Sequence, residues 1–245
     1  MSAAAPFARS VAAQSAVEAR LTLRRGENLL AMVGLPVAAL GLFGTLGLAG
    51  GHDLDSLVPG VLALALVASG LVNLGIATGF ERGYGVLKRL GGSPLGRDGL
   101  IAAKIAVVGA IALVQVIALL ALAFVIGWRP GPAASWLGVV VAIVVGSATF
   151  ASLGLLIAGR LRPEATLVVA NVLFLVSLLL GGVLLPIEDL PGPLQAVASL
   201  SPVGALAGAF ASSLTDGAGY IADLAVVAIW GAAAAILTLR TFRWD

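Results

Sequence analysis

The chain has 245 residues, of which 60% are hydrophobic and 11% are charged. Soluble domains carry about 25% charged residues, so this composition indicates an integral membrane protein and leaves no room for a soluble catalytic domain of useful size. The formal net charge of +2 does not imply a nucleic-acid partner, and the absence of cysteine excludes disulfides, thiol nucleophiles and cysteine-ligated metals.

The N-terminal region is expected to lie on the cytoplasmic side. Residues 1–15 are small and polar, with Arg9 as the single charge, and lack the apolar core of a signal peptide, so we expect a loose tail. Residues 16–28, AVEARLTLRRGEN, alternate apolar and charged side chains, which is typical of an interfacial helix. A plain basic juxtamembrane anchor is the alternative. The chain therefore divides into this region, residues 1–28, and a transmembrane domain, residues 29–245.

Six apolar stretches follow that can cross the hydrocarbon core, for which a helix needs roughly 20 residues. They run over residues 29–49, 57–78, 101–126, 136–158, 165–185 and 218–239. Residues 186–216, between the last two stretches, are too polar and begin too rich in proline for a simple span, so we expect re-entrant or interfacial helices on the outer side. The predicted fold class is an all-α integral membrane protein with six transmembrane helices.

The basic residues orient these spans. With both termini in the cytoplasm, all of the 14 Lys and Arg residues except Arg129 lie on the cytoplasmic side. Cytoplasmic loops of membrane proteins carry such an excess of positive charge. We therefore predict a multi-pass protein of the plasma membrane with cytoplasmic N and C termini.

The segment Glu81–Lys104, ERGYGVLKRLGGSPLGRDGLIAAK, is the longest charged interruption between the apolar stretches. On a helix with about 100° per residue, one side carries Tyr84, Val86, Leu87 and Leu90. The other side carries Glu81, Arg82, Lys88 and Arg89. Glycines and Pro94 then end the helix. We predict a short amphipathic helix over Glu81–Leu90 that binds a partner protein; an ordinary solvated loop is the alternative.

Chemistry within the membrane is not indicated. The span centres contain no Asp, Glu, Lys, Arg or His, which argues against ion-coupled transport, and Lys104 and Asp223 lie near span ends, where they can snorkel to the interface. No span contains a nucleophile near a base, so an intramembrane enzyme is not indicated. His52, Asp53 and Asp55 lack the surrounding hydrogen-bonding residues that support a metal site. The segment GGSPLGRD has Arg-Asp where a phosphate loop requires Lys-Ser or Lys-Thr. We expect no catalytic residue, metal site or cofactor.

Three polar residues lie inside the predicted spans: Asn73, Gln115 and Asn171. Such residues most often form hydrogen bonds between helices, worth roughly 1 kcal/mol. They are also candidates for a substrate path, because polar groups at membrane depth face protein or a cavity.

Three stretches together with this topology resemble the permease subunit of type-2 ABC exporters. LRRGENLLAMVGLP, Leu23–Pro36, looks like the family's interfacial helix entering its first span. The segment Glu81–Lys104 is similar to the family's loop after the second span. GGVLLPIEDLPGPLQAVASLSPVGALAGAF, Gly181–Phe210, looks like the family's outer segment with two prolines and a Ser-Pro turn.

The resemblance implies a transporter built from two permease subunits, as a homodimer or heterodimer, each binding an ATP-hydrolysing subunit on the cytoplasmic side. Glu81–Leu90 would be the coupling helix, although Gly83 and Gly85 weaken it by about 1 kcal/mol each relative to Ala. The chain would export a drug, lipid or glycolipid through the membrane without an ATPase site of its own. A non-transporting membrane scaffold or assembly factor that recruits a cytoplasmic partner is the alternative.

Overall fold

The centre of the fold is a continuous helical span, Leu54–Gly83. The computed structural model describes residues 7–24, 33–46, 54–91 and 96–242. In the central span, α4 (Leu54–Leu66) passes into a π-helix, η2 (Val67–Leu74), and then into α5 (Gly75–Gly83). Every residue from 57 to 71 is buried, because other helices surround this span on all sides.

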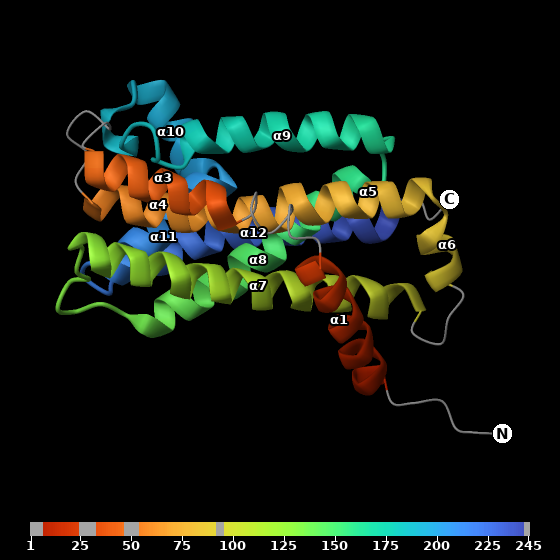
Figure 1. Cartoon of the computed structure of the whole chain (residues 1–245). Helices are drawn as coiled ribbons and strands as arrows, with labels where there is room; N and C mark the ends of the chain where they lie inside the picture. Colours follow the sequence, from red (N-terminus) through yellow and green to blue (C-terminus); the bar gives the residue numbers. More distant parts are fainter. Residues whose placement is uncertain (1–6, 25–32, 47–53, 92–95, 243–245) are drawn as a thin grey trace.

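The other elements are helices that precede and follow the central span. They are α1 (Phe7–Arg24), α3 (Leu35–Leu46), α6 (Val86–Gly91), α7 (Gly96–Ile126), α8 (Trp136–Ala158), α9 (Pro163–Leu180), the 3₁₀ turn η3 (Ile187–Asp189), α10 (Gly192–Leu200), α11 (Pro202–Leu214) and α12 (Tyr220–Thr241). The long helices run along one axis, whereas α1 leaves the bundle at a steep angle (Figure 1). The short helix α6 lies at one end of the bundle, called here the α6 end, and α10 lies at the other.

The described residues contain five helices long and apolar enough to cross a membrane, or six if the bent pair α10 and α11 counts as one span. The prediction of an all-α integral membrane protein is therefore confirmed. The five run over residues 54–83, 98–126, 136–158, 163–180 and 220–241. Only residues 33–46 of the first predicted span, 29–49, are described, and most of them form α3; the rest of that prediction lies outside the described residues.

The N-terminal region differs from the expectation of a loose tail. The helix α1 begins at Phe7, so residues 7–15 are helical and continue into the predicted interfacial helix. This helix packs on the first turns of α7, where the Ser15 hydroxyl donates to the Ala103 carbonyl at 3.5 Å. The packing explains the difference, since an apolar neighbour stabilises a helix that its own composition does not favour.

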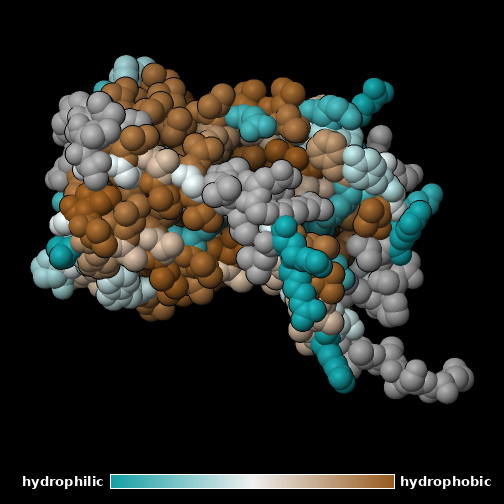
Figure 2. Space-filling model, viewed as in Figure 1, coloured by the Kyte–Doolittle hydropathy of each residue, from teal (hydrophilic) through white to brown (hydrophobic). Residues whose placement is uncertain are grey.

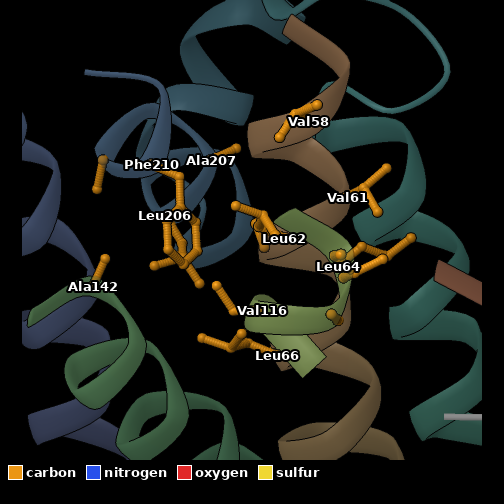
Figure 3. Packing of buried hydrophobic residues seen from close by; sticks show 14 of the residues in the cluster. Val58, Val61, Leu62, Leu64, Leu66, Val116, Ala142, Leu206, Ala207 and Phe210 are labelled. Carbon is orange, nitrogen blue, oxygen red and sulfur yellow. The ribbon is translucent and has the colours of Figure 1, made fainter. Parts of the chain in front are cut away.

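The segment before the last helix turns back into the bundle. α10 and α11 meet at an angle of 82°, and the Ser201 hydroxyl between them accepts a hydrogen bond from the Gly204 amide and caps α11. Most of α10 is exposed, but nine residues of α11 are buried. Leu206 and Phe210 of α11 lie against Leu62 of the central span in the apolar core (Figure 3). This segment thus joins an exposed helix, α10, to a largely buried helix, α11, through a sharp bend.

Glycines allow α8 to approach the central span closely. A Cβ at Gly70 would lie 2.8 Å from the Ala151 amide nitrogen, and one at Gly75 would lie 3.2 Å from the Gly154 Cα. A side chain at Gly70 would collide with α8, and one at Gly75 would be tighter than most contacts, so these backbones lie in direct contact. Apolar side chains cover the body of the molecule, and hydrophilic ones gather on α1 and at both ends of the bundle (Figure 2).

Candidate functional site

The α6 end carries a sharp elbow between α5 and α6. The helix α5 ends at Gly83, and a turn at Tyr84 and Gly85 follows before α6 begins at Val86. Gly85 has a φ of +70°, in the left-handed region that favours glycine. The prediction of one helix over Glu81–Leu90 is therefore wrong: its first residues belong to the central span and its last residues form α6.

The elbow also divides the apolar face that a regular helix would have. Tyr84 is 76% exposed and Val86 is 39% exposed, whereas Leu87 is 1% exposed and packs inside the protein. Lys88 and Arg89 are exposed; the side chain of Leu90 lies outside the described residues. The exposed surface of the elbow is therefore formed by Tyr84, Val86, Lys88 and Arg89, and Leu87 anchors it inside the protein.

A buried ion-pair cluster lies directly behind the elbow. The Lys104 ammonium of α7 lies 2.7 Å from the Glu81 carboxylate of α5 and 3.3 Å from the Glu18 carboxylate of α1. The Lys104 side chain is 3% exposed, so the expectation that it snorkels to the interface is wrong. Two carboxylates from other helices hold it inside, and these ion pairs connect α1, the elbow and α7.

Arg82 ties the elbow to the opposite side of the bundle. Its guanidinium donates to the Gly159 carbonyl at 2.8 Å and to the Leu161 carbonyl, in the loop between α8 and α9. A Cβ at Gly83 would lie 2.7 Å from the Pro163 ring at the start of α9. Through these contacts the end of α5 is held against the base of α9.

A groove opens beside the ion-pair cluster, between α1, η2 and α7. It is partly open to the outside and has polar residues on one wall and apolar residues on the other. Its polar wall consists of Glu18, Thr22, Ser69, Asn73, Glu81 and Lys104. Its apolar wall consists of Leu21, Leu74, Ala77, Val107, Val108 and Ile111. With its charged groups ionised, the polar wall has two negative charges and one positive charge.

The three candidate path residues do not share one site. Asn73 lines the groove. Gln115 is buried, at 2% exposure, on α7. Asn171 is exposed in the middle of α9, where its amide donates to the Leu167 carbonyl at 2.8 Å. Asp223, predicted to snorkel, has its carboxylate against α11, 2.9 Å from the position of a Cβ on Gly208.

Sequence reasoning missed the pairing of Glu18 with Lys104. The available signal was that Lys104 is the single charged residue in the predicted span 101–126. Because intramembrane charges are usually paired, this pattern calls for a carboxylate from another helix. Among the described residues, no group of three or more His, Cys, Asp or Glu side chains lies together as metal ligands would.

The elbow, the ion-pair cluster and the buried helix α11 all lie within the part of the chain that matches a known family. A family model described as ABC-2 type transporter matches residues 12–214. The chain belongs to the ABC-2 type transporter family. An ABC-2 permease domain is the transmembrane component of its transporter, and such permeases generally work with an ABC ATPase subunit. No curated protein matches the chain.

Proposed function

We propose that the chain is the transmembrane subunit of an ATP-driven exporter and that the elbow binds a separate ATPase subunit. Membership of the ABC-2 family supports the transporter role. The main support for coupling to an ATPase is the elbow, where Tyr84, Val86, Lys88 and Arg89 are exposed at the α6 end. An aromatic ring beside cationic side chains is a common composition for a protein-binding surface. In this proposal the α6 end faces the cytoplasm and the chain has no ATPase site of its own.

The elbow is connected so that movement of the ATPase reaches both sides of the bundle. Glu81 joins it to α7 and α1 through Lys104, and Arg82 joins it to the loop before α9. A push on α6 would therefore move these helices as a unit. Rigid-body movement of this kind is a common way of switching between two states, here inward-open and outward-open.

We assign α9 to the contact with a second permease subunit, which can be identical or different. Among its residues only Thr166, Ala170 and Ser177 are buried, so most of the helix faces outward. A hydrophilic spot interrupts the apolar surface over the middle of α9 (Figure 2), and the exposed amide of Asn171 belongs to this helix. A polar side chain facing lipid at this depth is unfavourable, so a protein partner is its expected environment.

The substrate in this proposal is an amphipathic or hydrophobic molecule such as a drug, a lipid or a glycolipid. Apolar side chains dominate the helices; besides buried hydroxyls, the described spans carry the three amides of Asn73, Gln115 and Asn171. We keep these three as candidate path residues, with Asn171 at the subunit interface. No nucleic acid has a role in this function.

The test is co-purification followed by turnover. The full-length chain should capture an ABC ATPase, and the reconstituted pair should hydrolyse ATP faster when drugs or lipids are added. Capture of an ATPase whose turnover responds to none of these molecules would favour the scaffold function. Capture of a different soluble protein, with no ATPase bound, would overturn the proposal.

A further inference from the structure

We propose that the groove between α1, η2 and α7 binds an amphiphile through a protonated primary amine, with its alkyl part against the apolar wall. This inference concerns the chemical class of the occupant. It rests on the proposed function only in treating the occupant as cargo; the binding itself requires neither an ATPase nor turnover.

The charge of the groove selects the headgroup. Glu18 and Glu81 contribute two carboxylates and Lys104 contributes one ammonium, so a negative charge is left over. Lys104 donates to Oε2 of Glu81, and the Gln14 amide donates to Oε1 of Glu18. A carboxylate can accept about four hydrogen bonds, so acceptor capacity remains at this wall. A second ammonium would balance the charge, whereas an anionic head would be repelled.

The apolar wall selects the rest of the ligand. Leu74, Val107, Val108 and Ile111 continue from the charged end of the groove along η2 and α7. An alkyl chain placed there would be stabilised by about 0.8 kcal/mol for each methylene removed from water. The groove thus combines a charged end for a head with an apolar side for a tail.

The π-helix provides independent support for a binding site. π-helical turns are rare, and they occur frequently at functional sites. The eight residues of η2 interrupt the central span beside this groove and supply Ser69, Asn73 and Leu74 to its lining. A π-helical turn is unfavourable in a regular span. Its position beside the groove therefore indicates that the shape of this site depends on it.

The test uses the cysteine-free chain, in which one introduced thiol is the only one. Ala77→Cys places a thiol in the groove wall. Val114→Cys, on the exposed side of α7, is the matched control. The rate of alkylation of each variant by a maleimide is measured in neutral detergent, without ATPase, as dodecylammonium or dodecanoate is added.

Dodecylammonium should slow the alkylation of Ala77→Cys and leave Val114→Cys unchanged, and dodecanoate should protect neither. Adding Glu81→Gln to Ala77→Cys should raise the dodecylammonium concentration needed for protection by about tenfold, because one charge-assisted hydrogen bond is lost. Glu18→Gln is the second variant, in case the first does not fold. Lipid nanodiscs then separate the sources: protection by phosphatidylethanolamine over phosphatidylcholine identifies an aminolipid, and protection by dodecylammonium alone identifies a non-lipid amine.

Equal protection by dodecylammonium and dodecanoate would overturn the assignment. So would protection that neither glutamate substitution weakens. In either case the ion-pair cluster is a structural element only. Capture of the ATPase by the elbow is measured separately, so its outcome does not depend on this one.

Discussion

Glu81 and Arg82 are adjacent in the chain, yet they hold the end of the central span to opposite sides of the bundle. Glu81 contacts Lys104 of α7 at 2.7 Å, and Arg82 donates to the Gly159 carbonyl at the end of α8 at 2.8 Å. Both side chains are engaged in these internal contacts, and neither belongs to the exposed surface of the elbow formed by Tyr84, Val86, Lys88 and Arg89. In the proposed function, the residues that follow them bind the ATPase, whereas Glu81 and Arg82 connect the elbow to the rest of the bundle. The first three predictions test these separate roles.

Tyr84→Asp and Val86→Asp should abolish capture of the ATPase while the protein inserts normally. Both side chains are exposed, so a charge there disturbs the proposed interface and not the core. We expect at least about a tenfold loss of affinity, as for the removal of a well-packed interface residue. The measurement is co-purification from membranes at fixed expression.

The matched controls for these variants are Trp136→Asp and Leu87→Asp. Trp136 is 51% exposed at the opposite end of the bundle, so its substitution should leave capture unchanged. Leu87 is 1% exposed, so Leu87→Asp should lower the yield of folded protein before any effect on binding can be read. Normal capture by both elbow variants would contradict the coupling role.

Arg82→Gln should loosen the base of α9. The substitution removes two hydrogen bonds from a charged donor to carbonyls of the loop between α8 and α9. We expect a loss of about 2 kcal/mol in stability, with ATPase capture retained and ATP turnover no longer stimulated by substrate. Stability is measured as the monodisperse fraction of the protein after heating in detergent. If substrate still stimulates ATP turnover to the normal level, the hydrogen bonds of Arg82 do not transmit movement from the elbow.

Lys104→Met should be strongly destabilising because it leaves two carboxylates without their cation. Removing one partner of a buried ion pair costs about 3–5 kcal/mol. The triple variant Lys104→Met, Glu18→Gln, Glu81→Gln should recover much of this loss, since no uncompensated charge remains. The comparison is made on thermal stability, and a triple variant less stable than the single one would refute the electrostatic explanation.

Gly70→Ala should destabilise the bundle, whereas Gly109→Ala should not. An added Cβ at Gly70 meets the α8 backbone at 2.8 Å, but one at Gly109 has nothing within 4 Å. Overpacking costs about 1–3 kcal/mol, and replacing an unobstructed helical glycine by alanine adds about 0.5–1 kcal/mol of stability. Opposite shifts of the melting temperature for these variants are expected; equal shifts would place the contact between α8 and η2 in doubt.

An Asn171→Cys variant should form a disulfide between two copies if the partner of α9 is a second copy of this chain. Ile229→Cys, on the exposed side of α12, is the control and should remain monomeric. The product is read on a non-reducing gel after mild oxidation in membranes. Cross-linking of the control, and not of Asn171→Cys, would move the subunit interface from α9 to α12.

The spans could be predicted where apolar composition alone defines them. The prediction of residues 136–158 coincides with α8, because this stretch is uniformly apolar and the hydroxyl of Ser135 caps its start. The elbow could not be predicted in detail, since a helical wheel assumes regular turns and Gly85 adopts a left-handed conformation. The π-helix also alters the register of the central span in a way that no local pattern indicates.

The ion-pair cluster and the groove depend on contacts between distant parts of the chain. Glu18 and Lys104 are separated by 86 positions, and their pairing follows from how α1 packs on α7. A lysine near the end of an isolated span is free to reach the interface, which is why snorkelling was expected. In the folded chain Lys104 instead pairs with two carboxylates, those of Glu18 and Glu81.

The position of Lys104 in the chain also bears on biosynthesis. Both of its carboxylate partners, Glu18 and Glu81, precede it in the sequence. Because folding follows synthesis from the N-terminus, they have already left the ribosome when α7 enters the membrane. The ammonium can therefore be neutralised as it is buried, which avoids the high free energy of an isolated charge in lipid. A rearranged gene that encoded α7 first would lose this order, and its product would depend on chaperones to protect Lys104.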